Sequence, residues 1–383
     1  MWITVSLVLF YLLAPAFLIY LCQKFKPLQK VGAVVLAYAL GLVFGNIGIL
    51  PVPSEKFSEL LGHRTSIPKD EFTGFLSAGQ VTETDIIANQ IAGIQDLLIT
   101  IIIPLAIPLL LFSLDLRKWL KLAKGALLSL ILAMVSLLIV IFVGYFLYSD
   151  SITDAWQVAG MLIGVYTGGT PNLAAIGTAL NVNPNIFILT HTYDLIIGAV
   201  ALLFLMTVAQ RLFHTFLPRF NPLRKGENVF HLADENEQME NFDTLFKKKE
   251  IPQLLKAFAL SVLIFAVGGG LSLLVPKSAQ TVTAILTITT LGLFASMIKP
   301  VNRIKNSFPL GMYFIIVFFF FFSSMAHLQS MFQIEFLQLF LYVLIVVVGS
   351  MIIHVGFSRL FNIDADTTII AITALTYSPP FVP

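Results

Sequence analysis

Long apolar runs alternate with short polar segments along most of the chain. A helix rises about 1.5 Å per residue, so about 20 apolar residues cross the roughly 30 Å hydrocarbon core of a bilayer. Runs close to this length recur throughout the chain, and each predicts a membrane helix. They cover residues 2–22, 31–50, 91–114, 126–148, 186–213, 254–275, 281–298, 309–326, 336–353 and 367 to the end.

Two longer polar stretches, residues 51–89 and 217–252, interrupt the apolar runs. The second has basic ends and an acidic middle, which is typical of a solvated linker between helix bundles. It divides the chain into two halves of similar pattern. We therefore expect a first transmembrane repeat at residues 1–216, a cytoplasmic linker at 217–252 and a second repeat at 253–383.

One apolar segment, residues 155–183, is interrupted in its middle by the sequence TGGTPN at positions 167–172. Each arm beside the interruption has about 12 residues, or about 17 Å of helix, which covers about half of the hydrocarbon core. The segment is therefore either a re-entrant hairpin with TGGTPN at its tip or a broken helix that crosses fully.

The distribution of basic residues favours the hairpin. Lys and Arg are enriched in cytoplasmic loops, and they dominate the loops at 23–30, 115–124 and 299–305. Placing these loops inside puts the N-terminus outside and the linker inside, which requires an odd number of crossings between them. The five apolar runs before the linker already supply that number, so the interrupted segment should enter and leave on one side. A full crossing would leave one basic loop on the wrong side.

The second half repeats this order and ends in a second interrupted segment. Four apolar runs precede Asp364, and the apolar segment from residue 367 breaks at the sequence YSPP, residues 377–380. A unit of four spans, a broken segment and a fifth span crosses an odd number of times, so two such units in tandem are antiparallel. This is the inverted-repeat architecture of secondary transporters. We expect about 40 further residues in the natural protein, for a return arm and a fifth span, unless the second unit is incomplete by nature.

The first interruption carries groups suited to binding a small solute at membrane depth. Irregular backbone is tolerated there only where protein or a water-filled cavity satisfies its polar groups. The glycines permit positive φ and close approach of a ligand, and Pro171 suits the first turn of a helix with Thr170 as its N-cap. Free N–H groups at a helix start favour an anion, and unwound carbonyls favour a cation. The alternative is a simple kink packed against small residues.

The second interruption is rich in proline. Its prolines remove backbone donors and leave carbonyls unpaired, although the segment is alternatively a loop at the end of the chain. We therefore expect substrate or ion contacts at both interruptions, from Thr167, Gly168, Gly169, Thr170, Pro171, Asn172, Tyr377, Ser378, Pro379 and Pro380.

A third candidate is Asp194 in the apolar run that follows the first interruption. It lies about 12 Å into that run, near the bilayer midplane, where a carboxylate is costly and indicates function. Helical spacing puts Thr190 and His191 on the same face. An ionised Asp194 could hold Na⁺ and a protonated one could carry H⁺. Alternatively, Asp194 makes a structural hydrogen bond to a broken-helix N-terminus, and His191 by itself is a packing or hydrogen-bonding residue.

Other polar or bulky residues in the apolar runs are interpreted as structural. We expect Gln95 and Asp96 to face lipid headgroups at the outer edge of their helix. We expect His354 to lie at the membrane interface, near the cytoplasmic end of its helix. The phenylalanines of residues 318–322 face lipid or fill packed space.

Composition supports a membrane protein and excludes several other classes. Of 383 residues, 57% are hydrophobic and 11% are charged, whereas soluble domains carry about 25% charged residues. The net charge of +2 gives no reason to expect nucleic acid as a partner, and the single cysteine, Cys22, excludes an internal disulfide. The chain lacks the common metal, nucleophile and phosphate-binding motifs. We therefore expect no enzyme and no cofactor, apart from Na⁺ as a coupling ion.

The stretch IPLAIPLLLFSLDLRKWLK at 103–121, the stretch TGGTPNLAAIGTALN at 167–181 and the Asp194 helix resemble the YjcL-like family of uncharacterised membrane proteins. That family is grouped by similarity with sodium–glutamate symporters, bile-acid symporters and cation–proton antiporters. The resemblance implies a panel domain and a core domain, with elevator-type alternating access around the two breaks. Pro171 stands where family members usually carry a small residue, and the second break is not the expected Gly-rich form. These departures leave the substrate open.

Together these features predict an all-α polytopic membrane protein built from two inverted repeats. The first hypothesis is a Na⁺- or H⁺-coupled secondary transporter of a small organic anion, such as an amino acid or a carboxylate. The alternatives are a cation–proton antiporter that uses Asp194 and a non-transporting membrane scaffold. We expect the protein in the bacterial inner membrane with its N-terminus outside, and by analogy with related architectures as a homodimer.

Overall fold

The protein is all-helical wherever the computed structural model describes it. Six helices within the described residues are long and apolar enough to cross a membrane, and four shorter apolar helices accompany them. Every apolar run predicted above coincides with one of these helices, so the prediction of an all-helical polytopic membrane protein is confirmed. The described residues are 2–25, 28, 32–51, 53–61, 66–114, 124–152, 154–218, 242, 249–304, 306–326 and 335–377.

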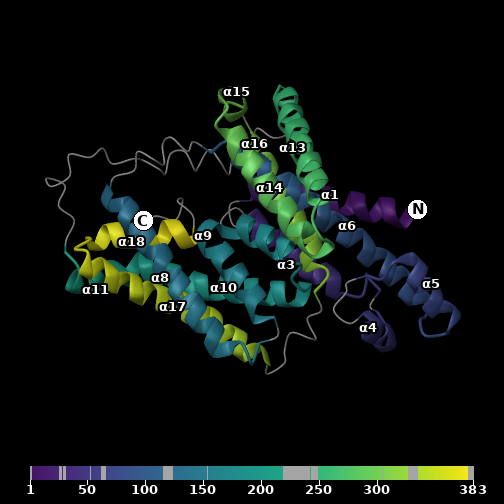
Figure 1. Ribbon diagram of the computed structural model, residues 1–383, viewed down its shortest axis with the longest axis horizontal. Helices are drawn as coiled ribbons and strands as arrows, with labels where there is room; N and C mark the ends of the chain where they lie inside the picture. Colours follow the sequence, from purple (N-terminus) through teal and green to yellow (C-terminus); the bar gives the residue numbers. More distant parts are fainter. Residues whose placement is uncertain are drawn as a thin grey trace.

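A first group of helices lies on the right of Figure 1 and contains elements from both halves of the chain. Its central pair, α6 and α16, is flanked on both sides by the remaining members. The first helix group consists of α1 (Trp2–Lys24), α3 (Ala33–Asn46), α6 (Glu83–Leu111), α13 (Ile251–Ser272), α14 (Gln280–Ser296) and α16 (Ser307–Ser323). Two short helices, α4 (Glu55–Leu61) and α5 (Lys69–Ser77), lie at its far end, beside the start of α6 (Figure 1).

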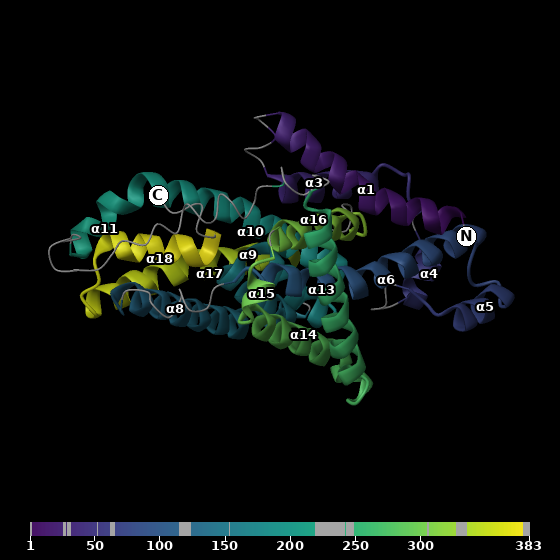
Figure 2. The same cartoon turned by 90° about the horizontal axis from the view of Figure 1, so that it is seen from above.

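A second group of helices lies beside the first, and the view from above shows the same division (Figure 2). It too combines both halves of the chain, because α8 packs against α17 and α9 packs against α18. The second helix group consists of α8 (Lys124–Tyr148), α9 (Ala155–Ala179), α10 (Pro184–Phe204) with its continuations η1 (Leu205–Ala209) and α11 (Gln210–Phe216), α17 (Glu335–Leu360) and α18 (Ala365–Tyr377).

The central pair of the first group is antiparallel. A Cβ on Gly311 near the start of α16 would lie 2.8 Å from Cγ of Leu110 near the end of α6. At the opposite ends, the side-chain amide of Gln95 donates to Oγ of Ser324 at 3.3 Å and to the hydroxyl of Tyr11 at 2.9 Å. The phenylalanines at positions 318–322 of α16 are all buried, so they fill packed space rather than face lipid.

The prediction that Gln95 faces headgroups is wrong, because Gln95 is buried within this packing. The cause is the length of α6, which begins at Glu83, well before the apolar run starts. A capping box between Thr82 and Asp85 starts the helix early, and Asp85 also accepts hydrogen bonds from the backbone N–H and hydroxyl of Ser54. Gln95 is therefore about three turns inside its helix rather than at its edge.

The second group has an antiparallel pair of its own, α8 and α17. The hydroxyl of Tyr342 near the start of α17 donates to the carbonyl of Ile141 at 2.9 Å. At the other end, Oγ of Ser129 near the start of α8 lies 3.4 Å from Nε2 of His354. Gly144 permits the close approach, since a Cβ there would meet the ring of Tyr342.

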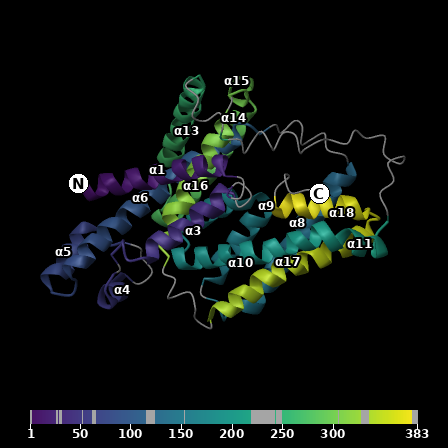
Figure 3. The same ribbon diagram turned by 180° about the vertical axis from the view of Figure 1, so that it is seen from behind.

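The two groups meet where α10 lies beside α3 and α16, as the view from behind shows (Figure 3). Phe187 of α10 packs against Phe318, Phe319 and Phe322 of α16. Tyr38 of α3 adds a polar link, because its hydroxyl donates to the carbonyl of Ile188 at 3.1 Å and is also hydrogen-bonded to Thr192. Around Phe187 the boundary is thus mainly aromatic, and elsewhere α9 packs against α6, α14 and α16.

Candidate functional site

The α9 segment is broken at the predicted glycines. Gly168 has φ −174° and ψ 15°, and Gly169 has φ 73° and ψ −163°, and neither pair of angles is helical. A φ of 73° lies in the left-handed region that favours glycine. The predicted interruption at TGGTPN is therefore confirmed.

The two arms of α9 fold back on each other. The side-chain amide of Gln157 in the first arm donates to the carbonyl of Leu180 at 3.0 Å, although a straight helix would separate residues this far apart by about 34 Å. A Cβ on Gly164 would lie 3.0 Å from the carbonyl oxygen of Asn172, so the arms touch near the tip as well. The predicted hairpin is confirmed as a fold, while the side of the bilayer from which it enters stays a prediction.

The tip of the hairpin exposes backbone groups to its surroundings. The hydroxyl of Thr167 donates to the carbonyl of Ile163 at 2.6 Å, which satisfies one acceptor of the first arm. Helical angles resume after Gly169, so Gly169 takes the N-cap position and the prediction of Thr170 as N-cap is wrong. The N–H groups in the first turn of the second arm have no acceptor within the helix. Pro171, in the same turn, has no backbone N–H group.

The side chain of Asn172 covers the break. Its amide nitrogen lies where a Cβ on Gly168 would stand. Asn172 itself is exposed, while Thr170 and Pro171 are half-buried. The tip is therefore a place where amide and hydroxyl groups reach the surface of the helix packing, which suits the binding of a polar solute.

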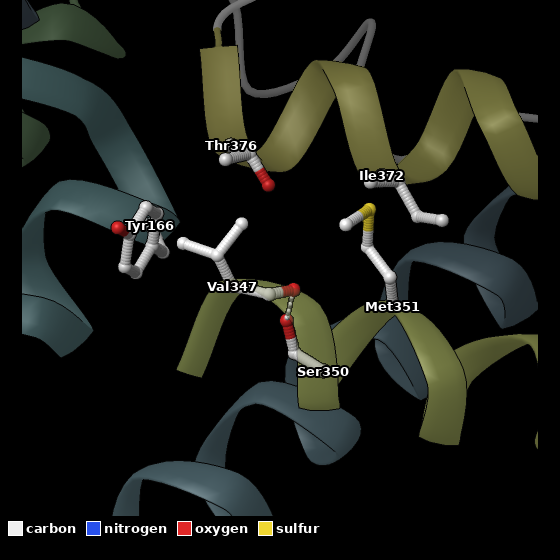
Figure 4. Close-up of a pocket in the computed structure, with 6 residues that line it drawn as sticks. All are labelled: Tyr166, Val347, Ser350, Met351, Ile372 and Thr376. Carbon is white, nitrogen blue, oxygen red and sulfur yellow. Dashed lines mark hydrogen bonds between the residues drawn. The ribbon is translucent and has the colours of Figure 1, made fainter. Parts of the chain in front are cut away.

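The end of α18 meets the hairpin tip around a small cavity of about 10 Å³. Figure 4 shows Tyr166 of the hairpin on one side and Thr376 of α18 on another, with residues of α17 below them. The hydroxyl of Ser350 faces the same space and donates to the carbonyl of Val347 at 3.1 Å. The broken segment of the first half thus adjoins the last described turn of the second half.

The second predicted break lies mainly outside the described residues. α18 ends at Tyr377, and Ser378, Pro379 and Pro380 follow beyond the described part of the chain. The predicted contacts of these residues stay predictions.

Asp194 lies on α10 beside His191, as the helical spacing predicted. Its Oδ2 atom is 3.4 Å from Nδ1 of His191, but the geometry is not that of a hydrogen bond, and neither ring nitrogen of His191 has such a partner among the described residues. The contact is electrostatic and depends on the protonation of His191. The buried His191 ring packs against Tyr38 and Phe319, with ring centroids 5.3 Å and 5.0 Å away, so its predicted packing role is confirmed.

Asp194 and Thr170 are equally far along the chain from the contact between α10 and the second hairpin arm. Gly177 of the second arm touches the ring of Phe187 near the start of α10, and the two elements run in opposite directions from there. Thr170 lies seven residues before Gly177 on the arm, and Asp194 lies seven residues after Phe187 on α10. Each count corresponds to about 10 Å of helix. The buried hydroxyl of Thr190 donates to the carbonyl of Ile186 at 2.7 Å, and its predicted contact with an ion or substrate stays a prediction.

Sequence reasoning missed the polar residues that α17 contributes. Ser350 lines the cavity at the tip, and the side chain of His354 is 1% exposed. The predicted position of His354 at the membrane interface stays a prediction. Ser350, His354 and Ser358 recur every four residues, so they form one stripe on an otherwise apolar helix. That spacing was the available signal. Within the described residues, no group of three or more His, Cys, Asp or Glu could hold a metal ion, so cation ligands there would be mainly hydroxyl and carbonyl oxygens.

Comparison with known proteins identifies the family. The family described as "Protein of unknown function (DUF819)" matches residues 73–376, which include the hairpin and the second helix group up to Thr376 but not α1 and α3 of the first group. The chain belongs to the DUF819 family. The chain is also 23% identical over 373 residues to "Uncharacterized membrane protein YjcL" of Bacillus subtilis (strain 168), covering 93% of this chain and 82% of that protein. The predicted resemblance to YjcL-like membrane proteins is therefore confirmed, and this DUF819 protein is an integral membrane protein.

Proposed function

We propose that the protein is an ion-coupled secondary transporter of a small organic anion. One observation carries the proposal: the hairpin tip from the first half of the chain meets the end of α18 from the second half inside the helix packing. The cavity between them, of about 10 Å³, admits about one water molecule, so the substrate would enter when these two elements move apart during the transport cycle. Secondary transporters bind substrate where discontinuous helices of two repeats meet near the bilayer midplane.

Close helix contacts support a pair of inverted repeats, with α3 equivalent to α14 and α6 equivalent to α16. Gly41 of α3 lets that helix approach the backbone of α16 near Phe320, close to the end of α16. In the equivalent place, a Cβ on Gly292 of α14 would lie 3.2 Å from Cα of Pro108, close to the end of α6. Each repeat therefore packs a glycine onto the corresponding helix of the other.

A pair of asparagines repeats the same relation. The side-chain amide of Asn46, at the end of α3, donates to the carbonyl of Ala326 just beyond α16 at 2.8 Å. The side-chain amide of Asn302, in the short helix α15 (Lys299–Asn302) after α14, donates to the carbonyls of Phe112 and Leu114 just beyond α6, both at 3.1 Å. Both asparagines satisfy carbonyls that a helix end leaves without partners.

The division into two helix groups supports a panel and a core of an elevator-type transporter. The second group holds the hairpin, Asp194 and the cavity, so it would be the core that carries the substrate. The first group would be the panel, and we infer that a homodimer forms through it. The aromatic boundary around Phe187 offers few polar contacts to break when one group slides along the other.

The chemistry of the tip suits an anion together with a cation. Unpartnered N–H groups at the start of the second hairpin arm favour a carboxylate. Asp194, which is 12% exposed, would hold Na⁺ or carry H⁺. Intramembrane carboxylates in such positions commonly serve ion coupling.

The test is uptake by the purified protein in liposomes. A thermal-shift panel of amino acids and carboxylates, with and without Na⁺, selects the labelled probe, starting with L-glutamate and citrate. We expect uptake driven by an inward Na⁺ or pH gradient, and a fall to the level of protein-free liposomes in Asp194→Asn. Asp150→Asn is the matched control, because Asp150 is exposed in the turn after α8 and should leave uptake unchanged.

Other outcomes would replace the proposal. Cation movement without any organic probe, lost in Asp194→Asn, would identify a cation–proton antiporter. The absence of gradient-driven flux in either protein would identify a non-transporting scaffold. Labelling of cysteines introduced into the first and last described loops would test the inferred placement in the bacterial inner membrane with the N-terminus outside.

A further inference from the structure

His354 lies deep inside the second helix group, and the proposed function gives it no role. It is on α17, its side chain is 1% exposed, and α8 and α18 enclose it. An ionisable side chain at membrane depth is costly, and its usual explanation is function. Histidine is also the side chain whose charge changes most readily near neutral pH.

The contacts around His354 favour a proton on one of its two ring nitrogens. Nε2 lies 3.4 Å from the hydroxyl oxygen of Ser129, and that hydroxyl lies 3.5 Å from the carbonyl oxygen of Thr367. A carbonyl only accepts, so the single hydroxyl proton goes to Thr367 and a lone pair of Ser129 faces the ring. In this arrangement Nε2 carries the proton of the neutral ring, and we assign that tautomer.

Nδ1 of His354 is consequently an unprotonated base. It is buried, and within the described residues it has no hydrogen-bond partner. An unpaired buried acceptor costs about 1–3 kcal/mol. The open lone pair is therefore available for a proton.

A second small cavity, also of about 10 Å³, lies against the His354 ring. It shares Ser350, Met351, Ile372 and Thr376 with the cavity at the hairpin tip, so the two spaces adjoin. A space of this size admits about one water molecule. The cavity is too small for an organic anion, but a water molecule in it would be able to deliver a proton to Nδ1.

Within the described part of the chain, the groups that face His354 offer it no counter-charge. Ser129 is the facing polar group from α8, and Thr367 is the facing one from α18. The carboxylates at the start of α18 are engaged elsewhere: Asp364 accepts from the N–H and hydroxyl of Thr367, and Asp366 accepts from Gln210 and lies 3.9 Å from His214.

The positively charged side chain of α17, Arg359, is engaged elsewhere as well. Arg359 donates to the carbonyl of Phe216 at 2.9 Å. A proton on His354 would thus stand as an uncompensated charge inside the packing, which is strongly unfavourable. An anion at the neighbouring hairpin tip would supply the missing negative charge.

We propose that Nδ1 of His354 is a proton-binding site, and that protonation there accompanies entry of the anion at the hairpin tip. The step adds one proton from water to the ring lone pair, the imidazole becomes an imidazolium, and the anion balances its charge. The proton leaves again when the anion leaves. The inference rests on the proposed transport function and names H⁺ as the coupling ion.

The first test observes the site directly and needs no transport. The full chain is labelled with ¹⁵N-histidine, placed in lipid nanodiscs and titrated from pH 8 to pH 5 by NMR, once in the presence of L-glutamate and citrate and once without an organic anion. Among the six histidines, the His354 signals are those lost in His354→Gln. We expect a proton on Nε2 and none on Nδ1 at the high end and, with the anions present, a change of the Nδ1 signal to that of a protonated nitrogen on acidification. A proton on Nδ1 at the high end, or no change over the range with the anions present, overturns the proposal.

The second test separates coupling from structure. L-glutamate and citrate serve as labelled probes in liposomes, with the exchange of labelled for unlabelled probe measured beside uptake driven by a pH gradient. In His354→Gln we expect exchange to persist and stimulation by the pH gradient to vanish. His214→Gln, on α11, is the matched control and should keep both activities. Stimulation that survives in His354→Gln, or loss of both activities, overturns the coupling role. If the wild-type chain moves neither probe, the transport proposal fails and the NMR titration alone decides whether the proton site exists.

Discussion

Gly169 has a backbone conformation that other residues adopt only under strain. Its φ of 73° and ψ of −163° lie in a region that is essentially restricted to glycine. We expect Gly169→Ala to lower the free energy of unfolding by about 1–3 kcal/mol, visible as a lower melting temperature of the detergent-solubilised protein. Gly269→Ala is the control, because a Cβ there meets nothing within 4 Å and alanine favours the helix. Equal melting temperatures for the two variants would mean that the tip has another conformation.

At the scale of single residues, the sequence predicted those features that depend only on neighbouring residues in the chain. Gly168 and Gly169 were found because clustered glycines beside a proline cannot continue a helix. The burial of His354 was not predicted, because its position near the end of an apolar run says nothing about its neighbours. Its true environment depends on Ser129 and Thr367, which the chain brings from α8 and α18, and no local pattern contains that information.

The hairpin of α9 is the element that most needs an independent test. Gly160 and Leu180 lie on opposite arms, and a Cβ on Gly160 would be 2.7 Å from Cδ1 of Leu180. In a background of Cys22→Ser, we expect Gly160→Cys with Leu180→Cys to form a disulfide under mild oxidation, detected as protection from alkylation by mass spectrometry. An unbroken helix would place these residues about 30 Å apart, far beyond disulfide reach.

A matched pair controls for random collisions of thiols. Gly160→Cys with Gly269→Cys joins the second helix group to α13 of the first, and we expect no disulfide between them. Rapid bond formation in both pairs would show only general flexibility. Free thiols at positions 160 and 180 would contradict the hairpin.

The link between α3 and α10 gives a second prediction at the element scale. The hydroxyl of Tyr38 bonds to Ile188 and Thr192 across the boundary between the groups. Tyr38→Phe removes about 1 kcal/mol of this attachment, so we expect about fivefold faster amide hydrogen exchange in α10. Tyr313→Phe is the control, because its hydroxyl donates to Leu12 within the first group. Unchanged exchange in Tyr38→Phe would show that packing alone holds α10.

The helices and the hairpin were predictable where a simple physical rule, such as the number of membrane crossings, determines them. The need for an odd number of crossings selected the hairpin, and its arms do meet at Gln157 and Leu180. The start of α6 was missed because a capping box extends the helix through polar residues, where hydropathy gives no signal. The short helices α4 and α5 were missed for the same reason, since they lie within a polar stretch.

For the whole molecule, the order of elements was predictable and their grouping was not. The sequence divides into halves along its length, whereas the helix groups each draw on both halves. That mixing depends on contacts such as Tyr342 to Ile141, which join residues far apart in the sequence. Equivalent roles for Asn46 and Asn302 become visible only when the two halves are compared in space.

Movement of one helix group along the other is the property on which the proposed mechanism depends. Tyr38 and Thr192 face each other across the boundary. In the Cys22→Ser background, we expect Tyr38→Cys and Thr192→Cys, bridged by a short reducible bis-methanethiosulfonate linker, to abolish probe uptake until a reductant restores it. Tyr11→Cys with Ser324→Cys is the matched control, because their hydroxyls lie 2.8 Å apart within the first group. This control bridge should leave uptake unchanged. Full uptake by the bridged Tyr38 and Thr192 pair would show that substrate crosses while the two groups stay fixed, and a fixed-barrier mechanism would then replace the elevator.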